Sequence, residues 1–484
     1  MRVHLIGVSG TGMGALAALL REAGDDVSGS DVAFDPPVGP MLQGLGVRCL
    51  EGYDAANLEP RPELVVVGNA IRRSNPEALA VEALALEGVL AKTSMSAALR
   101  ERFLVKRRPL VVAGTHGKTT TSAMCAWLLS RAGFEPGWFI GGVPKGLPAS
   151  AAIGSTRIRP GHGRAPFVVE GDEYDAVYWH KQPKFFDYVG VGADDVAIVT
   201  SVEHDHIDIY PDVASYEAAF AAFVARVPEG GLVVCDAHDP RARDIVSRHA
   251  RARVAWYALE RDDTGDVNAG WVAAPAAPIG GAAQAFDLFA GGVSCGRFTM
   301  AVPGHHNVRN AVAAIAACAE AFGASVNDLR GHLKGFEGVR RRQDLLGEPR
   351  GVRVYDDFAH HPTAVDETLR ALRARHPDGA LWVAFEPRSA TACRALHQDA
   401  YARAFGAADH VLLAPLGRSG LPEGERLDLE RLARELGPKA AAMPSVAAIV
   451  ERVAKGAARG DTVALFSNGA FGGIHQTLLE ELSR

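Results

Sequence analysis

The 484-residue sequence predicts an α/β protein built from three domains in series. Short β-rich runs alternate with Ala- and Leu-rich helical runs along the chain, a pattern typical of parallel sheets. Two glycine-rich turns, at 7–12 and 114–120, each follow a strand pattern and precede a helical one. At roughly 100–200 residues per domain, the length suits two or three domains. We place them at 1–105, 106–329 and 330–484.

The first domain shows strand and helix patterns in alternation. HLIGV (4–8) predicts a strand and MGALAALLREAG (13–24) predicts a helix. Further strands are expected at 26–31 and 63–71, which gives the βαβ order of a parallel sheet. The basic, proline-containing run 105–109 is interpreted as a linker.

The other two domains repeat this alternation. Residues 255–303 hold weaker strand patterns with many Gly and Ala residues, expected at the edge of the second domain, and 306–323 predicts an amphipathic helix. Strands of the second domain are expected at 109–114, 167–175, 196–206 and 230–236. Strands of the third domain are expected at 351–362, 380–387, 410–416 and 461–475.

Composition excludes several classes of protein. The net charge of −6 argues against a nucleic-acid binder, which normally carries a basic domain or stripe. The six cysteines show no CxxC spacing and are interpreted as free thiols in a reducing compartment. No apolar run reaches the ~18–20 residues of a membrane span, and no charged leader precedes the first strand pattern. We therefore expect a cytoplasmic protein without membrane or nucleic-acid partners.

The turn GTHGKTT (114–120) has the features of a phosphate-binding loop, although Val112 occupies the position of the first glycine in GxxxxGK[ST]. Glycines let backbone N–H groups surround a phosphate, and the following helix start favours negative charge. A lysine and a threonine in this frame suit the β/γ-phosphates and Mg²⁺. The residues expected to bind a nucleoside triphosphate are Gly114, Thr115, Gly117, Lys118, Thr119 and Thr120.

The first glycine-rich turn is less specific. Its order is GxxGxG (7–12), whereas dinucleotide-binding turns show GxGxxG. Asp31 ends the second strand pattern, where a partner for a ribose hydroxyl is expected. The residues leave three alternatives open: NAD, the diphosphate of another nucleotide, or tight packing alone.

Acidic motifs follow two strands of the second domain. EGDEYD (170–175) places four carboxylates at a strand end, which is costly without a cation or solvent, so a Mg²⁺ site is favoured over an exposed acidic turn. EHDHID (203–208) ends the next strand. Zinc sites prefer Cys and His sets of fixed spacing, so a second Mg²⁺ or a polarised phosphate fits better, with a plain polar loop as the alternative.

The third domain also carries chemistry-bearing residues at its strand ends. DDFAHHP (356–362) could serve acid–base catalysis, metal binding or substrate contact. Arg340–Arg342 precede it and could contact a phosphate or form a solvated charge run. EPRS (386–389) and SNGAFGG (467–473) lie at further strand ends, where an arginine can hold a carboxylate in bidentate fashion.

Taken together, these motifs resemble the Mur ligase family, the ATP-dependent amide-forming enzymes of peptidoglycan assembly. The resemblance rests on GTHGKTTT, the acidic strand end, the DHxD loop, PGHHNVRN (303–310) and DDFAHHPT (356–363), which occur in the family's order across nearly the whole chain. It implies an N-terminal Rossmann-like UDP-binding domain, a central P-loop ATPase domain and a C-terminal Rossmann-like domain that binds the peptide acceptor.

The opening turn and SGSD (28–31) resemble the branch of the family that binds UDP-N-acetylmuramate. Two acceptors occur in that branch: L-alanine in de novo synthesis, or the murein tripeptide L-alanyl-γ-D-glutamyl-meso-diaminopimelate in recycling. The tripeptide is favoured by similarity in GNAIRRSNPE (68–77), EGDEYDAVYWHKQPKFFDY (170–188), FEPRSAT (385–391) and SNGAFGGIH (467–475). L-alanine stays the alternative.

The resemblance implies that the lactoyl carboxylate attacks the ATP γ-phosphate, and that the amine then displaces phosphate from the acyl phosphate. In this scheme Lys118 steadies the phosphoryl group, Thr119 and Glu170 hold Mg²⁺, His206 helps hold a second Mg²⁺, and His116 faces the sugar's carboxylate or a phosphate. Further ATP contacts are expected from His306, Asn307, Asn310, Arg341 and Asp357. Contacts with the UDP-sugar are expected from Ser9, Gly10, Thr11, Gly12, Ser30, Asp31, Asn69 and Ala70. Contacts with the peptide are expected from His360, Arg388 and Asn468.

Some members of the family carry a carbamylated lysine beyond the DHxD loop, which is DHID (205–208) in this chain. Here 218–222 is alanine-rich, so we expect none. We also expect the third domain to close only when ATP is bound. The alternatives are an NAD-dependent dehydrogenase fused to an ATPase, a nucleotide-gated regulatory protein, and a folate- or cyanophycin-type ligase. The sequence leaves open the third residue and length of the peptide, and the oligomeric state.

Overall fold

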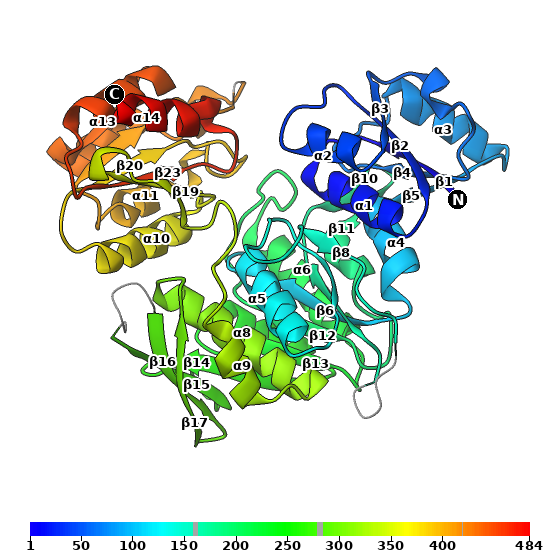
Figure 1. Cartoon of the computed structure of the whole chain (residues 1–484), viewed down its shortest axis with the longest axis horizontal. Helices are drawn as coiled ribbons and strands as arrows, with labels where there is room; N and C mark the ends of the chain where they lie inside the picture. Colours follow the sequence, from blue (N-terminus) through cyan, green and yellow to red (C-terminus); the bar gives the residue numbers. More distant parts are fainter. Residues whose placement is uncertain (158–162, 278–283, 419) are drawn as a thin grey trace.

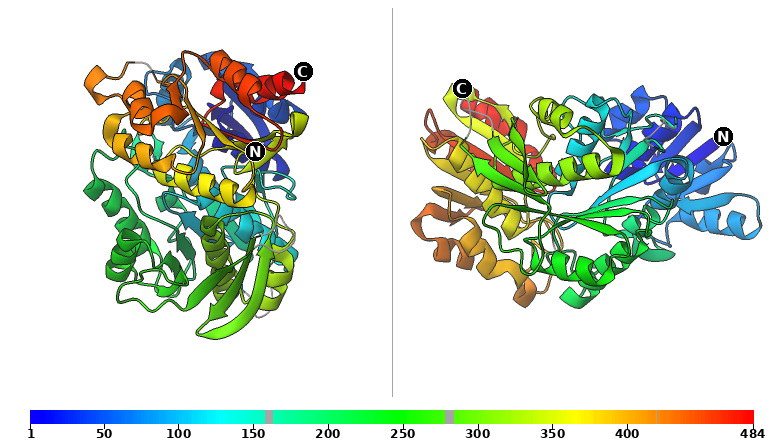
Figure 2. Two further views of the ribbon diagram at one scale, coloured as in Figure 1. Left: turned by 90° about the vertical axis from the view of Figure 1, so that its left-hand side faces the viewer. Right: turned by 90° about the horizontal axis from the view of Figure 1, so that it is seen from below.

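The computed structural model describes residues 1–157, 163–277, 284–418 and 420–484. The described strands form three large sheets that follow one another along the chain, and helices cover their faces. Figure 1 shows the N-terminal domain in blue and the C-terminal domain in yellow to red, both resting on the central domain. Seen from below, the two outer domains lie at opposite ends of the central one (Figure 2). The expected three-domain α/β architecture is confirmed.

The N-terminal sheet is fully parallel, in the order β3-β2-β1-β4-β5. Its strands are β1 (Arg2–Ile6), β2 (Asp26–Asp31), β3 (Arg48–Glu51), β4 (Leu64–Val67) and β5 (Ala91–Ser94). Its helices are α1 (Thr11–Glu22), α2 (Val38–Gly44), α3 (Pro76–Leu86) and α4 (Met95–Leu99). The sequence patterns found β1, β2, β4 and α1 but missed the edge strands β3 and β5, because RCLE and AKTS show neither an apolar run nor clear alternation.

The central sheet has ten strands, with β6 (Arg108–Ala113) between β12 (Val196–Val199) and β9 (Pro166–Glu170), all parallel. These strands are runs of buried apolar residues because helices cover both faces. Beyond them lie β7 (Gly137–Phe139), β8 (Ala151–Ala152), β13 (Leu232–Asp236), β14 (Arg253–Leu259), β15 (Trp271–Ala276), β16 (Gln284–Ala290) and β17 (Val293–Met300). A separate hairpin joins β10 (Asp175–Val177) to β11 (His180–Pro183).

Two pairs of helices cover the faces of the central sheet. On one face α5 (Lys118–Arg131) packs beside α8 (His305–Phe322) in a single apolar core. On the other lie α6 (Val213–Arg226) and α7 (Pro240–His249). The helix expected at 306–323 is confirmed as α8. The strands expected within 255–303 form the sheet edge, where β16 and β17 run antiparallel; residues 278–283 of that stretch lie outside the described residues.

The C-terminal sheet has the order β18-β19-β23-β20-β21-β22 and is parallel except for β18. Its strands are β18 (Asp344–Gly347), β19 (Arg353–Asp357), β20 (Leu381–Phe385), β21 (His410–Leu413), β22 (Ala440–Ala442) and β23 (Thr462–Phe466). Its helices are α10 (Pro362–Arg375), α11 (Gln398–Ala404), α12 (Leu429–Leu436), α13 (Val446–Gly456) and α14 (Ile474–Ser483).

The outer domains join the central domain in different ways. One apolar core continues from the N-terminal sheet into a face of the central sheet, through residues such as Leu99, Phe103 and Phe185. The cores on the two faces of the C-terminal sheet contain only residues of that domain, as far as the described residues go. Helix α9 (Val326–Leu333), Phe336 and Val339 pack in the central core, so we propose that the C-terminal domain begins after Val339.

Residues 105–107 alone connect the end of the first domain to β6, so the connection is shorter than the expected linker 105–109. Among the described residues, no helix is both long enough and apolar enough to cross a membrane.

Candidate active site

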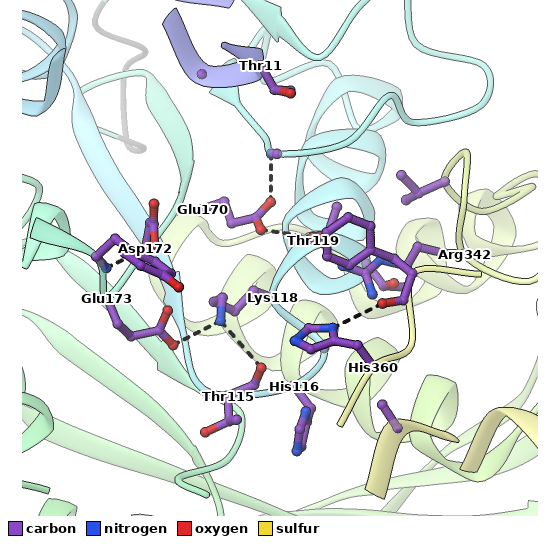
Figure 3. Close-up of a pocket in the computed structure, with 18 of the residues that line it drawn as sticks. Thr11, Thr115, His116, Lys118, Thr119, Glu170, Asp172, Glu173, Arg342 and His360 are labelled. Carbon is purple, nitrogen blue, oxygen red and sulfur yellow. Dashed lines mark hydrogen bonds and ion pairs between the residues drawn. The ribbon is translucent and has the colours of Figure 1, made fainter. Parts of the chain in front are cut away.

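A cavity of about 460 Å³ opens where the three domains meet, at the carboxyl ends of β1, β6, β9 and β19. Ligands of open α/β sheets bind at these strand ends. The structure brings together here most of the residues that the sequence pointed to (Figure 3). They are Gly10, Thr11, Gly12, Asn69, Ala70, Thr115, His116, Gly117, Lys118, Thr119, Thr120, Glu170, His206, His306, Asn307, Asn310, Asp357 and His360.

The phosphate-binding loop joins β6 to α5, and two of its glycines are required by geometry. Gly114 has φ +137°, and a Cβ there would lie 2.0 Å from the Thr200 hydroxyl oxygen. Gly117 has φ +77°, and its Cβ would lie 2.4 Å from Asn310 Oδ1. Left-handed backbone of this kind is open to glycine at little cost. The loop therefore turns tightly enough to present its N–H groups at the start of α5.

Lys118 is held in an ion pair inside the cavity. Its Nζ donates to Glu173 Oε1 at 2.9 Å and to the Gly114 carbonyl at 2.6 Å. Burial alone would lower the pKa of Lys118, but the charge of Glu173 outweighs burial and raises that pKa. The side chain of Glu173 is 1% exposed, so this ion pair lies almost entirely out of contact with water. Lys118 is thus a fixed, protonated ammonium group at the loop.

Oxygen atoms suited to Mg²⁺ gather beside Lys118. The Thr119 hydroxyl donates to Glu170 Oε1 at 2.8 Å, and the backbone N–H of Gly141 donates to Glu170 Oε2 at 2.7 Å. Glu173 Oε2 is buried and accepts no hydrogen bond from the described residues. A hydroxyl and carboxylates are the hard donors that Mg²⁺ prefers, so these residues fit that ion.

His206 lies at the edge of this group. Its Nε2 is 3.9 Å from Glu173 Oε2, and its ring stands against Tyr174 with centroids 4.4 Å apart. The residue has φ +55°, and its N–H donates to the carboxylate of Asp205 at 2.7 Å. This unusual backbone conformation turns the imidazole toward the acidic residues.

The first turn of α8 lies on the other side of the loop. The amide of Asn307 donates to the Pro303 carbonyl at 2.7 Å, and the amide of Asn310 donates to Asn307 Oδ1 at 3.2 Å. Both side chains are buried. His306 reaches the C-terminal domain, where its Nε2 lies 3.1 Å from Gln343 Nε2. His306, Asn307 and Asn310 are therefore fixed in place, and Asn310 lies beside Gly117.

The N-terminal turn faces the cavity through part of the predicted set. Ser9, Ser30 and Asp31 do not line the cavity but support the turn. The N–H of Ser9 donates to Asp31 Oδ2 at 2.8 Å, and the Tyr53 hydroxyl donates to Asp31 Oδ1 at 3.1 Å. Burial and the nearby Asp31 raise the pKa of Tyr53 to about 12, so this hydroxyl stays protonated and keeps donating.

Of the arginines at 340–342, the structure directs Arg342, not Arg341, toward the cavity. Arg341 contacts Asp356 at 3.2 Å and the carbonyls of Ser467 and Gly469 within its own domain. Arg342 instead donates to the Thr119 hydroxyl at 3.3 Å and lines the cavity. Arg341 has φ +61°, which bends the chain here.

Asp357 and His360 reach the cavity from the C-terminal domain, whereas Arg388 and Asn468 do not line it. Asp357 accepts from the N–H groups of Gln343 and Ala359 at 2.7 Å, and its burial raises its pKa. Arg388 is exposed, and within the described residues its guanidinium makes no hydrogen bond or ion pair. It is free to contact a ligand that approaches from the outer side of the site.

Sequence reasoning missed several groups that face each other here. Glu173, Glu203, Arg342 and His361 all lie inside motifs that the sequence singled out. The motifs indicated which segments lie at the site. They did not indicate which acidic, basic or histidine residue of each motif faces the cavity, because that depends on the turns of the backbone.

Comparisons with known proteins agree with this geometry. Three family models match: the Mur ligase family catalytic domain at 2–101, the Mur ligase middle domain at 186–318 and the Mur ligase glutamate ligase domain at 341–469. A UDP-N-acetylmuramate–L-alanyl-γ-D-glutamyl-meso-2,6-diaminoheptandioate ligase from Escherichia coli K12 is 37% identical over 485 residues, covering 100% of this chain and 99% of the relative.

Two further proteins show the same similarity. A UDP-N-acetylmuramate–L-alanine ligase from Kineococcus radiotolerans is 40% identical over 415 residues, covering 85% of this chain and 81% of the relative. The crystal structure of a murein peptide ligase from Psychrobacter arcticus superposes with a TM-score of 0.72 at 33% identity, covering 100% of this chain and 99% of the other.

Three parallel-sheet domains around a phosphate loop, with its lysine and hydroxyl facing buried carboxylates, define a three-domain nucleotide-binding protein. The chain belongs to the Mur ligase family.

Proposed function

We propose that this protein is an ATP-dependent ligase that joins the lactoyl carboxylate of UDP-N-acetylmuramate to the amine of L-alanyl-γ-D-glutamyl-meso-diaminopimelate, in the recycling of peptidoglycan. One observation carries the proposal: a single cavity contains the phosphate loop, the N-terminal glycine turn and residues of the C-terminal domain. ATP, a UDP-sugar and an acceptor can therefore meet there. The full-length similarity to the Escherichia coli ligase supports the choice of substrates.

Phosphorylation of the carboxylate converts a poor leaving group into a good one. The lactoyl carboxylate attacks the γ-phosphorus, ADP leaves, and an acyl phosphate forms. The loop N–H groups and the ammonium of Lys118 stabilise the negative charge on the transferring phosphoryl group. Thr119 and Glu170 would hold Mg²⁺, with His206 close to a second position, and the ion would neutralise charge on the phosphate oxygens.

The second half-reaction forms the amide. The peptide amine attacks the acyl carbon, and inorganic phosphate leaves from the tetrahedral intermediate. We propose that Asn307 and Asn310 hold the adenine side of ATP and that Arg342 acts where Arg341 was expected. His360, Arg388 and Asn468 would position the peptide, with Arg388 on a carboxylate, because a planar guanidinium can bind both carboxylate oxygens. Since both nucleotide substrates are intracellular, we place the protein in the cytoplasm.

L-alanine is the second candidate acceptor. The relative from Kineococcus radiotolerans, a UDP-N-acetylmuramate–L-alanine ligase, is 40% identical over 85% of this chain. This relative matches less of the chain than the full-length relatives do, so the full-length relatives are the better guide to the acceptor.

The test is phosphate release from ATP and Mg²⁺ in the presence of UDP-N-acetylmuramate, with either L-alanine or the tripeptide as acceptor. We expect turnover with the tripeptide and little with L-alanine. Turnover with L-alanine alone would assign the protein to de novo synthesis. Binding of both nucleotides without turnover on either acceptor would make it a regulatory protein.

A further inference from the structure

Two histidines from different domains face each other with a glutamate between them. His116 belongs to the phosphate loop of the central domain, and His361 lies at the start of α10 in the C-terminal domain. His116 Nε2 is 3.4 Å from Glu203 Oε2, and His361 Nδ1 is 3.6 Å from the same oxygen. The two imidazole rings have centroids 4.7 Å apart. One ligand atom from each of the three side chains lies within 4.8 Å of the others.

We propose that His116, Glu203 and His361 form a binding site for a transition-metal dication such as Zn²⁺, and that the bound ion links the central domain to the C-terminal domain. Two imidazole nitrogens and a carboxylate oxygen are typical zinc ligands. With bonds of about 2.0–2.2 Å, tetrahedral ligand atoms lie about 3.3–3.5 Å apart. Two of the three separations are therefore already close to that value.

Neighbours hold Glu203 in position, and the N–H of Thr363 donates to His361 Nδ1 at 3.4 Å, a long bond that an ion at this nitrogen would replace. The Thr363 hydroxyl donates to Glu203 Oε2 at 2.7 Å. The N–H of Glu203 donates to the Thr115 hydroxyl oxygen at 2.8 Å, and that hydroxyl donates to the Glu203 carbonyl at 2.8 Å. Hydrogen bonds of this kind orient metal ligands and raise affinity.

Burial and charge suit a cation at this place. His116 Nε2 is buried and hydrogen-bonds to none of the described residues. His361 is also buried, and a neutral imidazole at this place can bind a metal ion. The Glu203 carboxylate lies against both imidazoles, so the cluster offers two nitrogen ligands and one oxygen ligand.

The site is separate from the oxygen-rich group that fits Mg²⁺. Imidazole nitrogen favours zinc, copper or nickel, whereas the Thr119 and Glu170 oxygens favour Mg²⁺. His116 and His361 both line the cavity, so water or a substrate group can take the fourth position. Because the ligands come from two domains, an ion bound here should hold those domains together and slow any step that requires them to separate.

The test uses the full chain and measures metal binding directly. Zn²⁺ titration should show one tight site per chain and a raised Tm, and Co²⁺ should give the visible absorption of a low-symmetry nitrogen–oxygen site. His361→Asn and Glu203→Gln should each weaken binding about 10–100-fold or more. Asn at position 361 can still cap α10, and Gln at position 203 can still accept from Thr363, so both variants should fold. The Tm measured without metal checks this.

A matched control separates this site from the predicted Mg²⁺ positions. His206→Asn should keep the Zn²⁺ site, and excess Mg²⁺ should not displace the ion. Equal Zn²⁺ affinity in the wild type, His361→Asn and Glu203→Gln would overturn the proposal. So would loss of binding in His206→Asn alone, which would place the ion beside Glu173. None of these measurements depends on turnover. The metal site and the proposed ligase activity are therefore tested independently of each other.

Discussion

At the scale of single residues, the site depends on pairs of charged groups that are costly to separate. Lys118 and Glu173 are the clearest case, because the carboxylate is almost fully buried and its Oε2 accepts no hydrogen bond from the described residues. Removing one member of such a pair leaves an uncompensated buried charge, which costs about 3–5 kcal/mol. Function and stability are therefore coupled at this lysine.

We predict that Lys118→Met lowers kcat about 10²–10³-fold or more, because the charge that stabilises the transferring phosphoryl group is lost. It should also lower Tm, since Glu173 is left without its cation. The double variant Lys118→Met/Glu173→Gln should recover Tm but not activity. Thermal melts and phosphate release measure the two effects. A double variant as unstable as the single one would show that Glu173 does not depend on Lys118.

Arg388 is the residue that we expect to distinguish the acceptors. Its guanidinium is free among the described residues, and a charge-assisted pair with a peptide carboxylate is worth about 1.5–3 kcal/mol. Arg388→Met should therefore raise KM for the tripeptide about 10–100-fold and leave the affinity for ATP unchanged. Arg388→Lys keeps the charge but loses the bidentate geometry, so an intermediate KM is expected. An unchanged tripeptide KM in both variants would remove Arg388 from the peptide site.

At the scale of elements, much of the structure follows from local sequence. Buried runs such as PLVVA in β6 and VAIV in β12, together with the glycine turns after β1 and β6, were enough to predict parallel sheets with ligand sites at their carboxyl ends. The sequence did not predict which residues of the acidic and basic motifs face inward. The positive φ values of Arg341 and His206 decide this, and no periodicity encodes them.

Gly117→Ala tests the phosphate-loop turn. The residue has φ +77°, and an added Cβ would overlap Asn310 Oδ1. We expect weaker ATP binding and a lower Tm, with a backbone cost of at least about 1 kcal/mol. Gly331→Ala is a matched control, because that glycine lies in α9 with nothing within 4 Å of an added Cβ, and alanine there should be neutral or stabilising. Equal nucleotide affinity in the two variants would contradict the role of Gly117.

The end of α10 gives a prediction about pH. Burial and the nearby guanidinium groups of Arg353 and Arg375 lower the pKa of His376 to about 4. The unfolded chain takes up this proton near pH 6.5, whereas the folded chain does so only near pH 4. The free energy of unfolding should therefore fall as the pH drops from about 6.5 to about 4.

His376→Gln should flatten this part of the stability profile, because the side chain can still accept from the Tyr355 hydroxyl, which lies 2.9 Å from His376 Nε2, but cannot titrate. Urea unfolding between pH 4 and pH 7 measures it. His180→Gln, at an exposed position, controls for the loss of a histidine as such. The same pH slope in His376→Gln and the wild type would contradict the interpretation.

At the scale of the whole molecule, the domains are attached unequally. An apolar core continues from the N-terminal domain into the central domain, whereas the contacts of the C-terminal domain with the site are polar. Polar contacts such as Thr363 with Glu203 exchange readily for water, so this interface costs little to open. The C-terminal domain is therefore the part that we expect to move.

We predict that the C-terminal domain closes when nucleotide is bound. ATP would bring negative charge to the position where Arg342 meets Thr119, and this charge should attract the arginine across the domain boundary. Small-angle scattering should show a smaller radius of gyration with a non-hydrolysable ATP analogue and UDP-N-acetylmuramate than with neither. Arg342→Met should reduce that compaction and raise KM for ATP. Arg340→Met changes a neighbouring arginine that does not line the cavity and should leave both unchanged. No compaction in the wild type would mean that the domains are already closed without ligand, and the catalytic cycle would then have to proceed without the movement proposed here.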